Sequence, residues 1–367
     1  MTGFIQSIIT IVLFILILGG LVVIHELGHF VTARLAKVKV LEFGIGFPPR
    51  AKVMRSKGET LYTLNWLPIG GFVKLEGEDG NDADDPRSFS SQGLGRKLTI
   101  LVAGVLMNVL VAFVIFTGIA WLASPFVGVR FFEVQPGSPA AAAGLQPGDA
   151  IVAVDGQRYQ FMTGPNAVTG LRDRAGETVV LTIADAEGAR RDVAATLRTE
   201  AEINAQNGAL GISGATKPFE GYFYGEYTMN DLATAVQIGA RETVRWMGLI
   251  VGGLASLVGS VASNPTAPPP VSGPIGIATQ IGDIFWNSGW IMTLYVAGIL
   301  SANLAVVNIL PFPPLDGGRM LMLTLKRIFG ARISLRAEQL TYMVGFVFLF
   351  AFIIWVTGFD IIRSLGG

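Results

Sequence analysis

The chain has 367 residues, of which 51% are hydrophobic and 15% charged, and its 27 basic and 27 acidic residues leave no net charge. Soluble domains carry about 25% charged residues, so this composition excludes an ordinary soluble protein and indicates a membrane protein. The zero net charge excludes a bulk electrostatic attraction to nucleic acid. The absence of cysteine excludes disulfides and thiolate metal sites.

Five apolar stretches are candidates for crossing a membrane, for which a helix needs about 20 residues. They are Phe4–Ala36, Leu98–Ala123, Trp246–Ala262, Trp286–Phe312 and Gln339–Phe359. The first is expected to be a retained helix and not a signal peptide, because no Lys or Arg precedes Arg34. The third is short and rich in Gly and Ser, and we expect it not to cross. The expected fold is a polytopic α-helical membrane protein with four transmembrane helices.

The basic residues between these stretches predict an orientation. Eleven Lys and Arg residues lie from Arg34 to Lys97, and five more lie from Arg319 to Arg336. The positive-inside rule places both segments in the cytoplasm, which leaves the N-terminus and residues 124–285 outside. This arrangement requires that the third apolar stretch lies in the outer interface or packs as a hairpin.

The first apolar run contains both histidines of the chain, in the sequence His25-Glu26-Leu27-Gly28-His29. Residues four apart on a helix share one face, so the two imidazoles can bind one ion. In the H-E-x-x-H arrangement of zinc proteases, the glutamate is the general base. The motif also arises by chance, but ionisable side chains at hydrocarbon depth are costly and are usually functional. We therefore expect a metal centre here, with Glu26 activating a water molecule.

A third metal ligand is expected, because catalytic zinc usually takes three protein ligands. With no further His and no Cys, this ligand has to be Asp or Glu. Asp316 follows the fourth apolar stretch and, in the predicted orientation, comes near the cytoplasmic side, as the histidines do. Three prolines among residues 311–314 break the helix before it. A plain helix end capped by Asp316 is the simpler alternative, and Asp283 and Asp360 are rival ligands expected near the outer face.

Two motifs and several shorter segments carry a family resemblance. His25–His29 matches H-E-x-x-H, and Asn308–Gly317 matches N-x-x-P-x-P-x-x-D-G at every fixed position. The shorter similar segments are Gly104–Asn108, Gly44–Phe47, Gly70–Lys74 and Gly273–Gly276. The chain resembles, over nearly its whole length, the site-2 protease family of intramembrane zinc metalloproteases. Within that family it is most similar to the bacterial type that carries a PDZ domain and cleaves anti-sigma factors.

The resemblance implies four spans, Zn²⁺ as the cofactor, and hydrolysis of peptide bonds within or near the transmembrane segment of single-span proteins. It implies His25, His29 and Asp316 as metal ligands and Glu26 as the catalytic residue. Its implied substrate contacts are Asn303, Asn308, Asn108, Gly70, Gly71 and Phe72. Taken alone, each asparagine would more simply be a hydrogen-bonding residue between packed helices, and Asn108 would serve equally well behind the metal ligands.

The Gly-rich segment 41–75 leaves two roles open. It can supply a strand edge that pairs with an unwound substrate, or it can anchor the chain at the membrane surface. A proline in either strand should slow cleavage if pairing matters.

Residues 136–156 resemble the core of a bacterial PDZ domain. Alternating apolar residues predict strands at Val129–Val134, Ile151–Val154, Thr178–Ile183 and Asp192–Leu197. Such a domain can capture an extended peptide by β-augmentation, or it can act as a steric filter against bulky ectodomains, which is the role we favour. Well-known Gram-negative members carry two PDZ domains, whereas this chain has room for one, so a two-domain gate is not implied.

The expected organisation follows from these segments. In chain order it is the first transmembrane helix with the histidines (1–36), a cytoplasmic-side loop with a membrane-associated β-hairpin (37–96), the second helix (97–123), the PDZ domain (124–202), a region with an interfacial helix (203–285), the third helix (286–312), the Asp316 loop (313–337) and the fourth helix (338–362). The expected location is the bacterial inner membrane, with the PDZ domain extracytoplasmic.

The expected partners are the lipid bilayer and single-span membrane proteins, such as anti-sigma factors or remnant signal peptides, which a site-1 protease would cut first. Two other classes are weighed against this function. A transporter would show inverted repeats with matching broken helices, and the sequence shows none. A catalytically inactive scaffold would be expected to lack Glu26 or a metal ligand, and all of these are present.

Overall fold

A computed structural model describes residues 2–56, 58–78, 85–164, 166–204, 207–214, 222–264, 268–330 and 334–365. The chain divides into two compact units. One consists of residues Met1–Phe116 and Ala240–Gly367, and the other of residues Thr117–Gly239. We call them the helical unit and the sheet unit.

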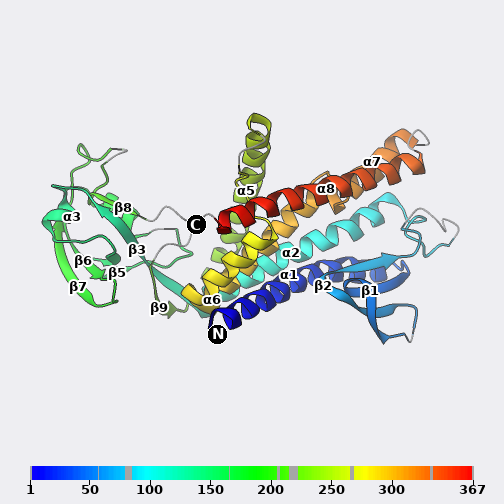
Figure 1. The fold of residues 1–367 in the computed structure, drawn as a ribbon, viewed down its shortest axis with the longest axis horizontal. Helices are drawn as coiled ribbons and strands as arrows, with labels where there is room; N and C mark the ends of the chain where they lie inside the picture. Colours follow the sequence, from blue (N-terminus) through cyan, green and yellow to red (C-terminus); the bar gives the residue numbers. More distant parts are fainter. Residues whose placement is uncertain are drawn as a thin grey trace. The chain divides into compact units, whose positions relative to one another are not determined.

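Long helices dominate the chain (Figure 1). They are α1 (Thr2–Leu35), α2 (Leu94–Leu122), α5 (Leu232–Ser263), α6 (Pro274–Ile309), α7 (Asp316–Phe329) and α8 (Leu335–Leu365). Within the described ranges, five of them, all except α7, are long and apolar enough to cross a membrane. The expectation of a polytopic helical membrane protein is therefore confirmed.

Helix α5 corrects one part of the prediction. It is a single continuous helix, so the predicted alternative of a hairpin over residues 246–262 is wrong. Its mean hydropathy of 1.6 is the lowest of the five candidate spans, and only 6% of its most apolar window is buried. By length and composition it still qualifies as a span, so its expected place in the interface stays a prediction.

Helix α6 begins twelve residues before the predicted start at Trp286, at Pro274. The early start has a tertiary cause. The buried carboxylate of Asp360 on α8 accepts hydrogen bonds from the backbone N–H of Gly273 (3.2 Å) and Gly276 (2.8 Å), which satisfies the first turn. The helix is interrupted at Gly289, whose φ of 77° only glycine adopts readily.

Strands β1 (Val40–Arg55) and β2 (Leu61–Leu75) form the expected hairpin, with a double pairing. Residues 42–45 of β1 pair with residues 61–64 and also with residues 71–74 of β2. Each strand thus contributes two segments, and the four segments lie side by side in the order 71–75, 40–47, 61–67 and 50–55. Residues 71–75 form one edge and residues 50–55 form the other. Figure 1 shows this hairpin in blue beside α1. A small core of Ala33, Val38, Val40, Leu75, Phe89, Ile100 and Leu101 joins it to α1 and α2.

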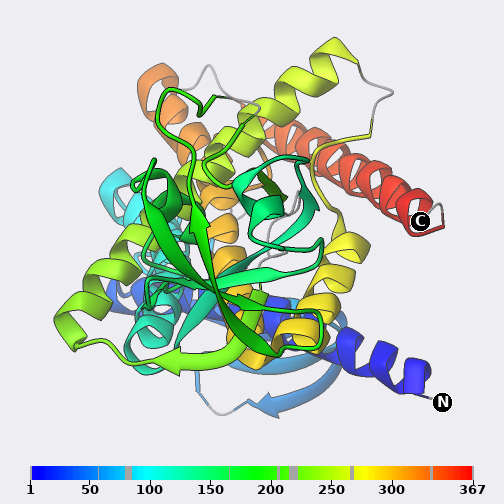
Figure 2. The ribbon, with the colours of Figure 1, turned by 90° about the vertical axis from the view of Figure 1, so that its left-hand side faces the viewer.

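The sheet unit, drawn mainly in green in Figure 2, contains one antiparallel sheet. Its elements are β3 (Ser124–Val134), α3 (Pro139–Ala142), β4 (Ala150–Val154), β5 (Gln157–Arg158), α4 (Ala167–Arg172), β6 (Thr178–Ala184), β7 (Arg190–Thr196), β8 (Ile212–Gly214) and β9 (Tyr222–Thr228). The strand order is β7-β6-β4-β3-β8, with β5 beside β4 and β9 beside β3. All four strands expected from alternation are present, and a buried apolar core lies between the sheet and its helices.

The predicted domain boundary at residue 202 leaves out two strands. Both β8 and β9 pair with β3, although they follow that boundary. They are short or rich in Gly and Tyr, so local alternation does not reveal that they belong to this sheet.

Candidate metal centre

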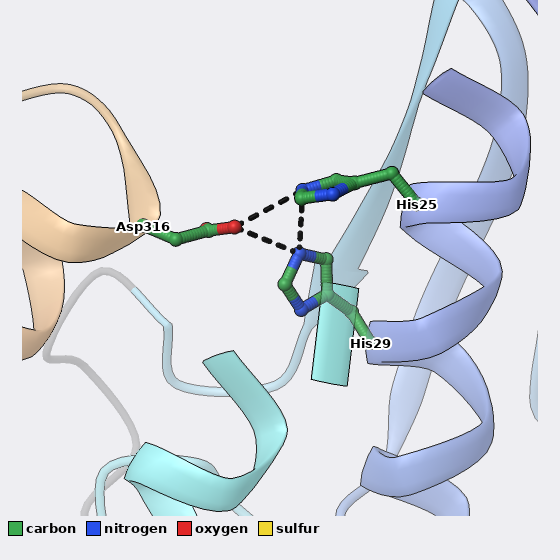
Figure 3. Close-up of side chains that lie close together, drawn as sticks. All are labelled: His25, His29 and Asp316. Atoms are coloured by element: carbon green, nitrogen blue, oxygen red, sulfur yellow. Dashed lines mark hydrogen bonds and ion pairs between the residues drawn. The ribbon is translucent and has the colours of Figure 1, made fainter. Parts of the chain in front are cut away.

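Three ligand atoms meet in the helical unit (Figure 3). The distance between Nε2 of His25 and Oδ2 of Asp316 is 3.0 Å, that between Nε2 of His29 and the same oxygen is 3.2 Å, and that between the two Nε2 atoms is 3.1 Å. Tetrahedral zinc with ligand bonds of about 2.0–2.2 Å requires ligand atoms about 3.3 Å apart. The near-equilateral triangle therefore fits zinc, and within the described ranges no other His or acidic residues gather in this way.

Helix geometry and tight backbone contacts position the three side chains. The two histidines lie one turn apart on α1, and Asp316 is the first residue of α7. The prolines before it end α6 at Ile309, as expected. A Cβ atom on the next residue, Gly317, would lie 2.1 Å from the carbonyl oxygen of Ile309. Glycine therefore allows α7 to start directly against the end of α6.

The rival ligands are placed elsewhere. Asp283 is exposed on α6, and Asp360 is buried at the amides that begin α6. Neither belongs to the group that could hold the metal.

Both histidines have a second contact that fixes the ring. Nδ1 of His29 lies 2.8 Å from the carbonyl oxygen of Ile100, and Nδ1 of His25 lies 3.2 Å from the side-chain amide of Asn108. When Nε2 faces a metal, Nδ1 carries the hydrogen atom and donates a hydrogen bond. The fully buried Asn108 has an amide oxygen without a partner, which a half-turn of the amide would present to His25. Asn108 therefore lies behind a candidate metal ligand.

Two glycines let α1 and α2 approach at this point. A Cβ on Gly28 would lie 2.5 Å from the carbonyl oxygen of Ala103, and one on Gly104 would lie 2.4 Å from Nε2 of His29. Sequence reasoning noted Gly104 only as part of a motif. The close approach explains why glycine is required there.

The histidine pair and Asp316 line a cavity of about 540 Å³. Of the other predicted site residues, it is lined by Glu26, Asn108, Asn308, Gly70, Gly71 and Phe72. Asn303 is not among the lining residues. The carboxylate of Glu26 accepts a hydrogen bond of 3.1 Å from the backbone N–H of Val73, on the edge strand of β2.

Sequence reasoning missed an ion pair in the same cavity. Nη1 of Arg319 donates to the carboxylate of Glu78 at 2.5 Å, and the other oxygen of Glu78 accepts from the backbone N–H of Leu75 at 3.0 Å. Arg319 lies one turn after Asp316 on α7, so the pair fixes the Asp316 helix to the end of β2. Two charged residues 241 positions apart give no local signal of such a contact.

Comparison with known proteins decides the family. The profile described as peptidase family M50 matches residues 13–352. The chain belongs to peptidase family M50, the site-2 protease family. A Clostridium acetobutylicum relative whose name describes it as a zinc metalloprotease is 33% identical over 363 residues, which cover 98% of this chain and 99% of the relative. The zinc metalloprotease RasP of Geobacillus kaustophilus is 28% identical, over 97% of this chain and 99% of the relative.

Membership of peptidase family M50 confirms the enzyme class expected from the two motifs. The protein is a zinc metalloprotease of the site-2 type, zinc is its cofactor, and its activity is intramembrane proteolysis. An Agrobacterium fabrum relative, also named as a zinc metalloprotease, is 29% identical over 388 aligned positions that cover 100% of this chain. The match thus spans both the helical unit and the sheet unit.

Proposed function

We propose that this protease hydrolyses peptide bonds within or near the transmembrane segment of single-span membrane proteins, with zinc held by His25, His29 and Asp316 and with Glu26 as the catalytic base. The observation that carries the proposal is the triangle of three ligand atoms, 3.0–3.2 Å apart, in the cavity that Glu26 also lines. Anti-sigma factors and remnant signal peptides are the proposed substrates, after a first cut by a site-1 protease.

The chemistry divides between the cofactor and the chain. Zinc, when bound, lowers the pKa of a water molecule and polarises the scissile carbonyl. The carboxylate of Glu26 accepts a proton from the attacking water and then passes it to the nitrogen of the leaving amine. Glu26 is therefore an ionised carboxylate again when the peptide bond has been cleaved. The bond from Val73 orients the Glu26 carboxylate within the cavity.

The edge strand at residues 71–75 is the proposed substrate platform. A helical substrate hides its peptide groups, so it has to unwind and then pair with exposed backbone. Gly70, Gly71 and Phe72 line the metal cavity beside this edge, and Asn308 faces the cavity from α6. We propose that Asn308 holds the substrate backbone from the opposite side, that Asn108 orients His25, and that Asn303 contacts substrate outside the cavity.

The sheet unit is proposed to be an extracytoplasmic PDZ domain in a bacterial inner-membrane protein, and to act as a size filter. One feature favours peptide capture as a second role. A cavity of about 470 Å³ lies between α4 and residues 203–204 and 208–212, with apolar lining from Val168, Leu171 and Leu210. Deletion of residues 124–228, which removes the whole sheet, should allow cleavage of uncut full-length substrates if the domain is a filter. Loss of cleavage of pre-cut substrates would support capture.

The proposed function is tested with a single-span substrate in detergent, cleaved by purified wild type, Glu26→Gln and Asp316→Ala. We expect cleavage by wild type alone, with zinc retained in Glu26→Gln and lost from Asp316→Ala. The control Glu187→Gln removes an exposed carboxylate of the sheet unit and should cleave like wild type. Full activity of Glu26→Gln, or retained zinc with activity in Asp316→Ala, would contradict the assignment.

A further inference from the structure

A second cavity of about 450 Å³ lies in the helical unit where α1 ends, away from the metal ligands. Its lining comes from the end of α1, from β1, from the turn between β1 and β2, and from the segment before α2. Basic side chains predominate in it. The charged lining residues are Arg34, Lys37, Lys39, Arg55 and Arg87, with Glu59 as the one acidic residue among them.

Two of the five cations are neutralised. Lys39 forms an ion pair with Glu76, and Arg87 forms one with Glu59, each at 2.6 Å. The hydrogen bond from Arg87 holds the pKa of Glu59 below its usual range, so Glu59 stays ionised. Glu59 is therefore a charged carboxylate that is already paired with Arg87.

The other three cations, Arg34, Lys37 and Arg55, form no ion pair with any residue that the structure describes. Arg34 lies in the last turn of α1, Lys37 follows that helix, and Arg55 ends β1. Bringing like charges to one cavity costs free energy unless an anion joins them. The cavity therefore has the charge of an anion site.

Exposed apolar side chains stand close in sequence to two of these cations, Arg34 and Arg55. On α1, Val31 is 42% exposed and Leu35 is 77% exposed. On β1, Val53 is 42% exposed and Met54 is 49% exposed, directly before Arg55. Exposed apolar residues next to basic ones are typical of a lipid contact, because acyl chains contact apolar side chains and the headgroup phosphate contacts basic ones.

We propose that this cavity binds the phosphate headgroup of an anionic phospholipid. Arg34, Lys37 and Arg55 contact the phosphate oxygens, and the exposed apolar residues of α1 and β1 lie along the acyl chains. Arginine and lysine are the usual partners of phosphate groups. Free phosphate offers the same oxygens, but it would make no use of the exposed apolar residues of α1 and β1. The proposal does not depend on the proteolytic mechanism, since none of the three residues lines the metal cavity.

The test measures binding to the purified full chain in a non-ionic detergent. The probes are short-chain phosphatidylglycerol, the matching phosphatidylcholine, and inorganic phosphate. The site variant is Arg34→Gln/Lys37→Gln/Arg55→Gln. The control variant Lys52→Gln/Arg327→Gln/Arg336→Gln loses the same charge from exposed residues outside the cavity. Zinc content shows that each variant is folded, and the single variant Lys37→Gln repeats the test with less perturbation.

We expect wild type to prefer phosphatidylglycerol to both other probes. The site variant should bind it at least about tenfold more weakly, since each cation at a membrane surface contributes roughly a fivefold change. The control variant should stay within about twofold of wild type, and Lys37→Gln should fall between the two. Equal weakening by the control would show non-specific charge attraction and overturn the site. Equal affinity for phosphatidylcholine would show an unselective lipid surface, and equal affinity for inorganic phosphate would show a free-anion site.

Discussion

At the scale of single residues, the candidate metal centre requires a position without a side chain as well as the three candidate ligands. Gly104 on α2 faces both candidate ligands, and an added Cβ would lie 2.4 Å from Nε2 of His29 and 2.8 Å from Cε1 of His25. Real Cβ atoms do not approach other atoms so closely. The ligand triangle can keep its dimensions only while this position lacks a side chain.

We therefore expect Gly104→Ala to displace the imidazoles and to lower zinc affinity by about 10–100-fold, the usual cost of disturbing the surroundings of a metal ligand. Zinc per chain, measured by elemental analysis after dialysis against a buffered zinc solution, checks this. Gly118→Ala on the same helix is the control, since an added Cβ there meets nothing within 4 Å. Wild-type zinc affinity in Gly104→Ala would contradict the expected clash.

At the scale of elements, the edge of the hairpin is already occupied. The outward N–H groups of Val73 and Leu75 donate to the carboxylates of Glu26 and Glu78. A substrate strand that pairs here has to replace those bonds. The opposite edge, residues 50–55, pairs only with residues 62–65 of β2. A proline should therefore affect the cleavage rate differently at the two edges.

We expect Val73→Pro to slow cleavage strongly, because proline removes the N–H that a substrate strand would need. Val53→Pro on the opposite edge is the control and should change the rate little. The measurement is the cleavage rate over a range of pH. Loss of pairing lowers the rate by the same factor at every pH, whereas a disturbed Glu26 would shift the profile. Equal rates for Val73→Pro and wild type would favour the role of membrane anchor for the hairpin.

In the sheet unit, Glu226 on β9 links three strands. Hydrogen bonds from Arg190 on β7 and Arg158 on β5 hold its pKa below the usual range. A carboxyl group with a lowered pKa in the folded state stabilises the fold above its unfolded-state pKa, about 4.5, and this stabilisation is lost as the pH falls through the folded-state value.

Because Glu226 is 42% exposed on its side chain, solvent screening keeps the contribution small. Glu226→Gln should lower the free energy of β9 opening by at most about 1 kcal/mol near neutral pH. The difference from wild type should disappear in acid, once the carboxyl group is protonated. Hydrogen exchange of the β9 amides measures the free energy of opening at neutral and at acidic pH, with Glu187→Gln as the control. A difference that persists in acid would show that packing, not charge, explains the effect.

At the scale of the whole molecule, the candidate metal site joins distant parts of the chain. His25 lies on the first helix, whereas Asp316 begins α7, after the entire sheet unit has intervened. A ligand that binds only the folded chain stabilises it, and the stabilisation grows with the logarithm of the affinity. The metal should therefore stabilise the helical unit in particular.

Removal of zinc with a chelator should lower hydrogen-exchange protection at the start of α7 and leave the sheet unit unchanged. Re-addition of zinc should restore it. The variant Asp316→Ala should show the low protection with or without zinc, and serves as the matched reference. Equal loss of protection in β6 and β7 would show global unfolding and contradict the local role of the metal.

The number of membrane crossings is also a property of the whole molecule. If α5 lies in the outer interface, cysteines introduced at Met229 and Pro270, before and after it, should be labelled from the same side of the membrane. The chain contains no other cysteine, so both labels are unambiguous. Labelling from opposite sides would make α5 a fifth crossing and would place the two basic loops on opposite faces.

The sequence by itself determined the long apolar helices, the four main strands of the sheet unit and the enzyme class. These features depend on local signals: long apolar runs, alternation, and two motifs whose residues are close together in the chain. The sequence did not predict α7, which lies in the expected Asp316 loop (313–337), or the early start of α6. Elimination limited the third ligand to Asp or Glu, because the chain has only two histidines and no cysteine, and the predicted depth in the membrane favoured Asp316 over Asp283 and Asp360. The rest could not be read locally.

Only the tertiary structure decided the contacts between distant segments. The capping of α6 by Asp360, the pair between Glu78 and Arg319, and the membership of β8 and β9 in the sheet all join residues far apart in sequence. Such contacts depend on where helices and strands pack, which propensity and periodicity do not specify. The candidate metal site is the clearest case: the sequence predicted its three residues, and only packing could place their ligand atoms within 3.2 Å of one another.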